Sequence, residues 1–504
     1  MRVTVRPPTQ VPSSLALTRF QGEPLERHPL WKKVSAAERK LLQSYLRRGS
    51  LDEASSVISV PRGSRGAIFV LGLGKRSAWN QRKFELAIRR SVVAARAEQV
   101  RELGVALVPF LPPNLTLERA SQLAAENAGM AQYEFGRYRA EHKPKSSVNL
   151  VLITPAADKR LAARGAAVGL VVGEQTAEAR DLGNVPGGEM TPRSLAEAAV
   201  AAGKRHGFKV EVLGQKELVQ LKAGAILGVA RGSAEEPTFT IMRYQGASPK
   251  DAPYVFVGKG VTFDSGGLNL KPGKHMNDMH LDMVGGAAVI AALGAAARLK
   301  LPVNIVGLVP AVENMPGSAG YRPGDILTSL SDKTIEVLNT DAEGRIILAD
   351  ALTYAERFKP RLVIDLATLT GACMVALGLT RAGLMSPDAV LASYLQGVGA
   401  RAGEELWPLP LSEDDEDEVR GTFADVQNEG KSSPYGGAIH GALFLWQFAK
   451  AFPWAHLDIA GPMKLVDGQL MGKGASGFGV RFLVELVRSG YPGALAVARL
   501  PRTS

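Results

Sequence analysis

Seven charged side chains lie in or directly after strongly apolar stretches of this 504-residue chain. Such stretches are typical of buried strands, so the charges are expected at strand ends and partly out of water. An isolated buried ion loses several kcal/mol of solvation, and these groups must therefore pair with one another or bind metal. Four of the seven are carboxylates and three are cations: Asp264, Asp282, Asp341 and Glu343, with Lys259, Lys271 and Arg345.

The four carboxylates carry the charge that two divalent cations would balance, which predicts a binuclear metal site. Asp341 and Glu343 stand two residues apart, and in an extended segment both side chains would point to one side, toward the same ions. Two metal ions about 3.5–4 Å apart activate a water molecule between them and polarise the group that it attacks. Hydrolysis is therefore the predicted chemistry.

The identity of the metal is open. Hard carboxylate oxygens favour Mg or Mn, whereas zinc commonly takes nitrogen or sulfur ligands, although a cluster without histidine does not exclude zinc. The single cysteine, Cys373, can form no internal disulfide, and the seven histidines show neither C-x-x-C nor H-E-x-x-H spacing. A zinc site of thiolate and imidazole ligands is therefore not expected.

The apolar stretches predict the sheets that position these charges. Alternation of strands with helices indicates an α/β fold, in which ligands bind at the carboxyl ends of parallel strands. In the second half of the chain, strands are expected within 254–260, 303–313, 334–341, 361–371 and 455–462, with a helix over 283–300. In the first half, strands are expected within 67–75, 105–110 and 148–154, with helices over 84–100 and near 117–130.

Composition divides the chain into two α/β domains, each a mixed, mostly parallel sheet flanked by helices. The N-terminal domain is expected to be the smaller one, and the C-terminal domain the catalytic one. The expected order is a basic, poorly ordered leader over 1–50, the N-terminal domain over 51–171, a connecting helix and linker over 172–195, and the catalytic domain over 196–504.

The net charge of +11 is concentrated in the first hundred residues. These hold 19 Lys and Arg against 7 Asp and Glu, whereas the remaining 404 hold 41 against 42. Clustered basic side chains attract nucleic acid, which makes a nucleic-acid-binding protein on the same fold the alternative function. Because no RNA- or DNA-binding motif accompanies the charge, a solvated basic surface is the simpler interpretation.

Targeting and membrane segments are not expected. The first twenty residues contain three prolines and lack the apolar run of a secretory signal. Uninterrupted stretches of about 18 apolar residues, as a membrane span requires, are also missing. A cytoplasmic location without membrane contact is therefore predicted.

Three motifs resemble the leucyl aminopeptidases, also called cytosol aminopeptidases. They are VGKGVTFDSGGLNLKPG (257–273), the MxxDM at 279–283 and, above all, NTDAEGR (339–345) followed by ILADAL. DLGNVP, LATLTGA and HLDIAG add to the resemblance, which covers about 172–490. It implies an enzyme that removes N-terminal residues, preferably leucine or other apolar ones, from peptides by attack of a hydroxide that bridges two metal ions.

The resemblance also implies a role for each charged residue. Lys259, Asp264, Asp282, Asp341 and Glu343 would bind two divalent ions, Mn or Zn, with Mg as a further candidate. Lys259 would be a neutral amine ligand, Asp264 and Glu343 would bridge the ions, and the backbone carbonyl of Asp341 would be a further ligand. Lys271 and Arg345 would be catalytic, Lys271 as donor to the carbonyl oxygen and Arg345 as holder of a bicarbonate ion that acts as base.

By the same resemblance, an apolar pocket would take the first side chain of the peptide, and the chain would form a homohexamer. Two methionines among small residues suit leucine or methionine. The pocket residues would be Met279, Thr368, Leu369, Gly371, Ala460 and Met463. His280, where the family has Lys or Arg, and a longer loop over 428–437 depart from the family pattern; His280 is expected at the surface.

Overall fold

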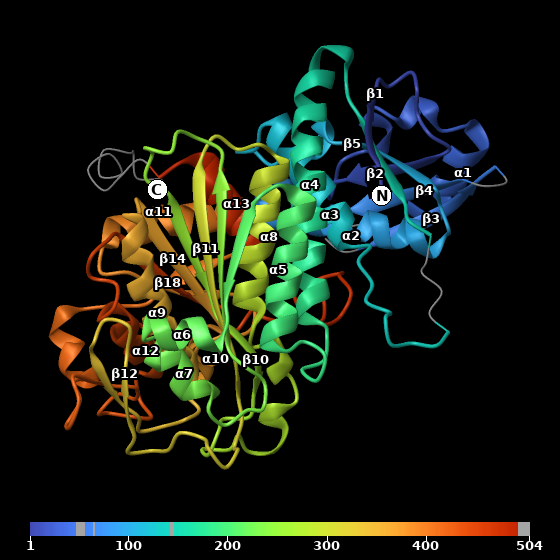
Figure 1. Cartoon of the computed structure of the whole chain (residues 1–504). Coiled ribbons are helices and arrows are strands. Elements are labelled where there is room, and N and C mark those ends of the chain that lie inside the picture. The colour runs from blue at the N-terminus through green and yellow to red at the C-terminus, as the bar shows by residue number, and fades with distance from the viewer. Residues whose placement is uncertain (47–55, 64–65, 142–145, 492–504) are drawn as a thin grey trace. The chain divides into compact units, whose positions relative to one another are not determined.

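The computed structural model describes residues 1–46, 56–63, 66–141 and 146–491, which form two compact units. The first unit comprises Met1–Ala177 and Asp467–Lys473, and the second comprises Glu178–Val466 and Gly474–Ser504. In each unit helices cover a sheet (Figure 1). The predicted two-domain α/β fold with a larger C-terminal domain is confirmed.

The sheet of the first unit has the strand order β1-β6-β5-β2-β4-β3 and is parallel except for the β3–β4 pair. Successive side chains of β2 enter two different cores: Leu15 and Leu17 pack with Trp31, while Ala16 packs with Phe84. Both faces are therefore buried, as expected for parallel strands. The strands are β1 Val3–Arg6, β2 Ser14–Arg19, β3 Val57–Arg62, β4 Gly66–Gly72, β5 Glu102–Ala106 and β6 Asn149–Ile153. The helices are α1 Ala36–Leu46, α2 Gln81–Ala97, α3 Leu117–Met130 and the first part of α4 Lys159–Gly183.

The prediction of a separate leader over 1–50 is wrong for residues 1–46, whereas 47–50 lie outside the described residues. β2 lies between β4 and β5 in the sheet, β1 pairs with β6, and Leu42 of α1 is buried in the same unit. The sequence pattern did not reveal β2 because the strand has only six residues, too few apolar side chains to stand out among the prolines and charges around it.

A mixed sheet forms the centre of the second unit, in the order β16-β15-β18-β14-β9-β11-β8-β7, with β10 paired to β11. β11, β9, β14 and β18 run parallel to one another, so their carboxyl ends meet at one edge. The strands are β7 Lys209–Leu213, β8 Thr238–Gln245, β9 Tyr254–Gly258, β10 Gly260–Asp264, β11 Asn304–Asn314, β14 Leu362–Ala367, β15 Ala382–Met385, β16 Leu406–Pro408 and β18 Trp454–Asp458.

A small second sheet takes a stretch that was expected in the main sheet. Of residues 334–341, only Thr334–Glu336 (β13) form a strand, which pairs with β12 (Ile326–Thr328) and β17 (Val426–Gln427). The main-sheet prediction for this stretch is therefore wrong. The remainder of the stretch forms the turns that lead to α9 (Glu343–Ala355).

Helices cover both faces of the main sheet (Figure 1). α9, α7 (Gly224–Ala230) and α12 (Gly437–Trp446) share one core with β8, β9, β11 and β14. The other helices of this unit are α5 Pro192–His206, α6 Gln215–Leu221, α8 Val284–Arg298, α10 Gly371–Leu377, α11 Ala389–Ala402 and α13 Val480–Ser489. The break between the two units, after Ala177, falls inside α4 and within the predicted linker over 172–195.

One stretch of the described residues, Gly273–Arg298, is long and apolar enough to cross a membrane. Its most apolar window is 89% buried inside the protein, and it contains α8, whose small side chains pack beside β9 and β11. Burial in the core therefore accounts for its composition.

Asp350 on α9 joins the first turn of α7 and the turn after β12 to the core of the second unit. Its carboxylate, 1% exposed, accepts hydrogen bonds from the backbone N–H groups of Ile226 at 2.9 Å and Leu330 at 2.7 Å. Burial raises the pKa of Asp350 to about 7, against the effect of these hydrogen bonds. The folded protein therefore keeps this proton at pH values where the unfolded chain, with an ordinary pKa of 3.8, has released it.

We predict that Asp350→Asn destabilises the protein by about 1–3 kcal/mol, because the amide can replace only one of the two acceptor oxygens. Between pH 4 and about 7 the folded wild type binds more protons than the unfolded chain, so this group's contribution to stability falls as the pH rises. The difference in melting temperature between wild type and variant should thus be larger at pH 5 than at pH 7.5. Asp415→Asn, at an exposed position, should show neither effect.

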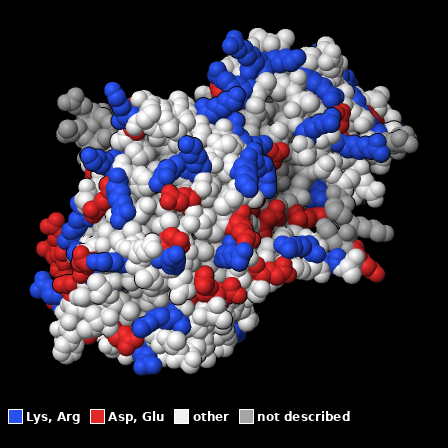
Figure 2. Space-filling view, in the orientation of Figure 1, with Lys and Arg blue, Asp and Glu red and all other residues white. Residues whose placement is uncertain are grey.

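The basic first unit carries many Lys and Arg side chains on its visible face, with acidic side chains among them (Figure 2). Some of the basic groups are paired: Arg6 with Glu102 at 2.8 Å and Arg76 with Glu23 at 2.6 Å. The nucleic-acid alternative therefore still rests on the net charge of residues 1–100. Duplex binding by the whole chain that weakens steeply with salt would support it.

Candidate active site

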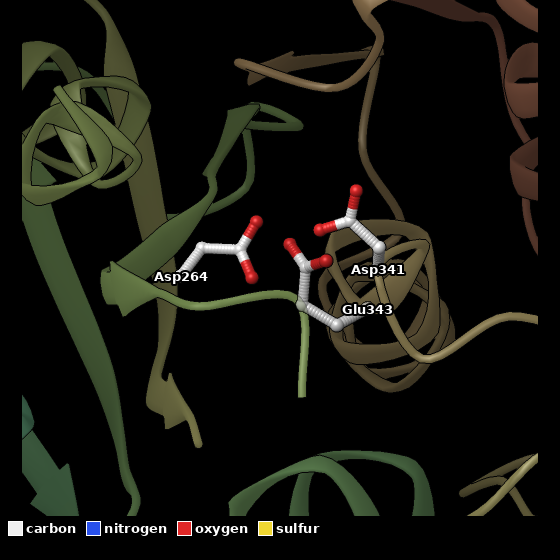
Figure 3. A group of neighbouring side chains, drawn as sticks. All are labelled: Asp264, Asp341 and Glu343. Carbon is white, nitrogen blue, oxygen red and sulfur yellow. The ribbon is translucent and has the colours of Figure 1, made fainter. Parts of the chain in front are cut away.

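The chemistry-bearing residues lie at the edge where the parallel strands of the second unit end. Lys259 directly follows β9, Asp264 is the last residue of β10, and Asp282 precedes α8. Glu343 is the first residue of α9, and the carboxylates of Asp264, Asp341 and Glu343 face one another (Figure 3). One oxygen from each of these three side chains lies within 4.8 Å of the others.

The predicted geometry of Asp341 and Glu343 is wrong, although both carboxylates reach the same place. Asp341 lies in a turn, and Ala342 (φ −105°, ψ 43°) leads into the helix that Glu343 opens. A tight turn into a helix, and not the alternation of an extended strand, brings the two side chains together.

Two lysines lie between the four carboxylates. Lys259 Nζ is 2.7 Å from Asp282 Oδ2 and 2.7 Å from Glu343 Oε1. Lys271 Nζ is 2.7 Å from Asp264 Oδ2 and 2.6 Å from Asp341 Oδ1. Lys259, Asp264, Asp282 and Glu343 are at most 4% exposed, whereas the side chains of Lys271 and Asp341 are 14% and 34% exposed. The sequence-predicted cluster is thus brought together around a buried centre that opens on one side.

Thr368, just after β14, forms hydrogen bonds with both Lys259 and Asp282. Its hydroxyl donates to Asp282 Oδ1 at 2.6 Å, and its backbone carbonyl accepts from Lys259 Nζ at 3.0 Å. These contacts hold Asp282 and Lys259 at the strand edge before any ligand arrives.

The cluster holds more negative charge than its lysines balance. Burial and the neighbouring Asp264 and Glu343 raise the pKa of Asp341 to about 7, although Lys271 acts in the opposite direction. Burial also raises the pKa values of Asp264 and Asp282. Burial alone would lower the pKa of Lys259, but Asp282, Glu343 and Asp264 together raise it. Carboxylates that resist ionisation in this way are stabilised by additional cations.

The donor set fits divalent metal ions. Glu343 Oε2 is buried and accepts no hydrogen bond, and Glu343 Oε1 and Asp282 Oδ2 meet only the lysine ammonium, outside hydrogen-bond geometry. Buried carboxylate oxygens without donors are the ligands that hard divalent cations prefer. Residues of this part of the chain could therefore hold metal between the side chains of Figure 3.

A cavity of about 340 Å³ opens beside the cluster and contains all six predicted pocket residues in its wall: Met279, Thr368, Leu369, Gly371, Ala460 and Met463. Lys271 and Arg345 also line it, whereas His280 is half-buried and outside the wall. Several further wall residues were not predicted from the sequence, among them His275, Asn339, Met374, Glu429, Ser433, Tyr435 and His440. Glu429, Ser433 and Tyr435 lie in the loop over 428–437, which the sequence analysis singled out as a whole.

Gly344 in the NTDAEGR motif leaves space for the lysine of the cluster. A Cβ at this position would lie 2.5 Å from Lys259 Cε and 2.7 Å from Lys259 Nζ. A methyl group there must displace the ammonium from Asp282 and Glu343.

We predict that Gly344→Ala lowers metal content and reduces activity by about tenfold to a hundredfold, since misplaced groups around a metal site have effects of this size. Metal analysis and hydrolysis rates measure the two effects. Gly188→Ala is the matched control, because a Cβ there meets nothing within 4 Å. Normal metal content and normal rates in Gly344→Ala would show that the lysine has no part in the site.

The geometry agrees with known proteins. Residues 177–484 match the description "Cytosol aminopeptidase family, catalytic domain", and residues 32–142 match "Cytosol aminopeptidase family, N-terminal domain". A probable cytosol aminopeptidase of Aromatoleum aromaticum is 41% identical over 472 residues, which cover 92% of this chain and 93% of the relative. Another, of an Azoarcus species, is 42% identical over 466 residues, or 90% and 91%.

Solved structures are similar over nearly the whole chain. The bottromycin maturation enzyme BotP in complex with Mn has a TM-score of 0.82 and 35% identity, covering 95% of this chain and 99% of that one. A tomato leucine aminopeptidase mutant has a TM-score of 0.85 and 32% identity, covering 97% of each chain. Family matches in both units and relatives that align along nine-tenths of the sequence show that this chain belongs to the cytosol aminopeptidase family.

Proposed function

We propose that this aminopeptidase removes leucine and other apolar residues from the free N-terminus of peptides, with two divalent cations as cofactors. One observation carries the proposal: four carboxylates and the side chains of Lys259, Lys271 and Arg345 converge at a cavity that has one apolar wall and opens to solvent. A free amine is a good metal ligand and an internal peptide nitrogen is a poor one, so a site of this kind selects chain ends.

Lys259, Asp264, Asp282, Asp341 and Glu343 would hold the two cations. When bound, the cations supply the charge that activates water and polarises the scissile carbonyl. Lys259 would have to bind as a neutral amine. The surrounding carboxylates raise its pKa, so only adjacent cations could repel its proton. Mn is supported by the BotP complex, and Zn and Mg remain candidates.

Lys271 and Arg345 would carry out the remaining chemistry. Lys271 would donate to the carbonyl oxygen as the carbon becomes tetrahedral. Arg345, 8% exposed, donates from Nη1 to the backbone carbonyl of Asn428 at 2.8 Å, while its Nε is buried without a partner. An unpartnered guanidinium N–H in the wall of the cavity supports the proposal that Arg345 holds a bicarbonate ion that acts as base.

The apolar part of the wall supports a preference for leucine. Met279, Leu369 and Met463 supply flexible apolar surface, while Gly371 and Ala460 leave space. Methionines adapt to branched and unbranched side chains alike. The backbone of Thr368 and Leu369, next to Asp282, would receive the peptide amine.

Hydrolysis of leucine-p-nitroanilide before and after chelation, with Mn, Zn or Mg added back, tests the proposed function. We expect chelation to abolish the activity and one of the metals to restore it. N-acetylleucine-p-nitroanilide is the control, because it lacks the free amine and should not react. Activity that survives complete removal of metal, or equal cleavage of the acetylated substrate, would contradict the proposal.

We also propose a cytoplasmic homohexamer. Relatives of this chain are named cytosol aminopeptidases, which supports the location. Light scattering on the purified protein would give six times the chain mass of 53.5 kDa if the hexamer forms. A mass of one or two chains would contradict it.

A further inference from the structure

The wall of the cavity contains one carboxylate outside the metal cluster, that of Glu429, among the described residues. Glu429 follows β17 and stands in the loop over 428–437. Neither the metal ligands nor the catalytic pair needs an acid at this position. Its charge therefore calls for a separate explanation.

The surrounding contacts fix the place of Glu429 beside the NTDAEGR turn. Asn428 donates from Nδ2 to the carbonyl of Asn339 at 2.6 Å, and its own carbonyl accepts from Arg345 at 2.8 Å. The carbonyl of Glu429 accepts from Gln427 Nε2 at 2.8 Å. Glu429 is thus held next to Arg345. The apolar residues of the wall come from other elements, because they follow β14 and β18 or precede α8.

The scissile peptide bond has one side chain before it and one after it. The cavity likewise has two different walls, an apolar one that contains Met279 and Met463 and a polar one that contains Glu429. If the apolar wall takes the first side chain, the wall that carries Glu429 is left for the second. We infer that Glu429 receives the side chain of the second residue and favours peptides with Lys or Arg there. This inference rests on the proposed function.

The hydrogen bonding of the Glu429 carboxylate supports this assignment, because in the part of the chain that the structure describes only one of its two oxygens has a donor. Ser433 Oγ donates to Glu429 Oε1 at 2.7 Å; among the described residues the carboxylate forms no ion pair within 4.0 Å, and the charge of Arg345 acts on it from a greater distance. The other oxygen is available to an incoming ammonium or guanidinium, and hydrogen bonds between charged groups are stronger than neutral ones. Tyr435, 78% exposed in the same wall, offers a ring face to such a cation.

Amidated dipeptides test the inference: Leu-Lys-NH2, Leu-Gln-NH2 and Leu-Glu-NH2 share a first residue and differ in the second. For the metal-loaded wild type we expect kcat/KM for Leu-Lys-NH2 to exceed that for Leu-Gln-NH2 by about fivefold to tenfold, with Leu-Glu-NH2 lowest. Added salt should reduce the ratio, because the pair is partly exposed. In Glu429→Gln the ratio should fall toward one, and in Glu429→Lys the preference should invert toward Leu-Glu-NH2.

Glu413→Gln removes the same charge at an exposed position outside the cavity, and its selectivity should equal that of the wild type. Because selectivity is a ratio within each protein, a general loss of rate does not obscure it. Equal rates for Leu-Lys-NH2 and Leu-Gln-NH2 in the wild type, or an unchanged ratio in both Glu429 variants, would overturn the inference while leaving the aminopeptidase intact. Failure to cleave any of the three peptides would instead contradict the proposed function.

Discussion

Lys271→Ala is expected to lower kcat by about 10²- to 10³-fold while the protein keeps its full metal content. Lys271 Nζ reaches Asp264 and Asp341, yet its side chain is 14% exposed and lines the cavity, where a substrate carbonyl would approach. Deleting one donor to a developing oxyanion in other hydrolases has an effect of this size. Steady-state assays measure kcat, and elemental analysis measures the metal content independently.

The comparison of the two losses decides the role of Lys271. Lys464→Ala is the control: Lys464 pairs with Asp278 outside the wall of the cavity, so both kcat and metal content should stay normal. A proportional loss of metal and of kcat in Lys271→Ala would show that this lysine only holds carboxylates in place.

Glu343→Gln should lose bound metal and at least about 10³-fold in activity. Glu343 is 1% exposed, its Oε2 has no hydrogen-bond donor, and Lys259 alone contacts Oε1. An amide replaces one ligand oxygen by a donor N–H₂ group that repels cations, although the shape of the side chain is retained. Changes outside the ligand set already lower metal affinity by about 10- to 100-fold, and loss of a proposed ligand itself should exceed that.

Metal titration followed by thermal unfolding measures this effect apart from activity. A ligand that binds only the folded state raises the melting temperature with its concentration, so added Mn should stabilise the wild type and fail to stabilise Glu343→Gln. Glu313→Gln, a half-buried acid outside the cavity, should respond to Mn like the wild type. A Glu343→Gln protein that binds two ions with wild-type affinity would remove Glu343 from the proposed ligand set.

The sequence alone was informative wherever a local pattern determines the outcome. Continuous apolar runs predicted β9, β11, β14 and β18, because strands buried on both faces need apolar side chains on both. The positions of Lys259 and Asp264 at strand ends followed from the same runs. The types and order of the charged residues were sufficient for the family resemblance that the comparisons confirm.

Other features depend on contacts that no local pattern contains. β2 is buried because it lies between β4 and β5, although the prolines before it and the charges around it suggested a leader. Glu343 points at Asp264 because a turn starts a helix there, and the residue types around it allow an extended segment equally well. Backbone conformation at such a junction is decided by the packing of α9 against the sheet, which involves residues far away in the chain.

Residue types, their order and the strands that carry them were thus determined by the sequence itself, since burial and charge act over a few neighbouring residues. The tertiary structure alone decided which further groups share the cavity with the residues that the family resemblance had named. Asn428 meets Asn339 across 89 positions of the chain, and this contact places Glu429 beside Arg345. Such pairings arise only when separate elements pack together, because the free energy that selects them comes from the whole folded unit.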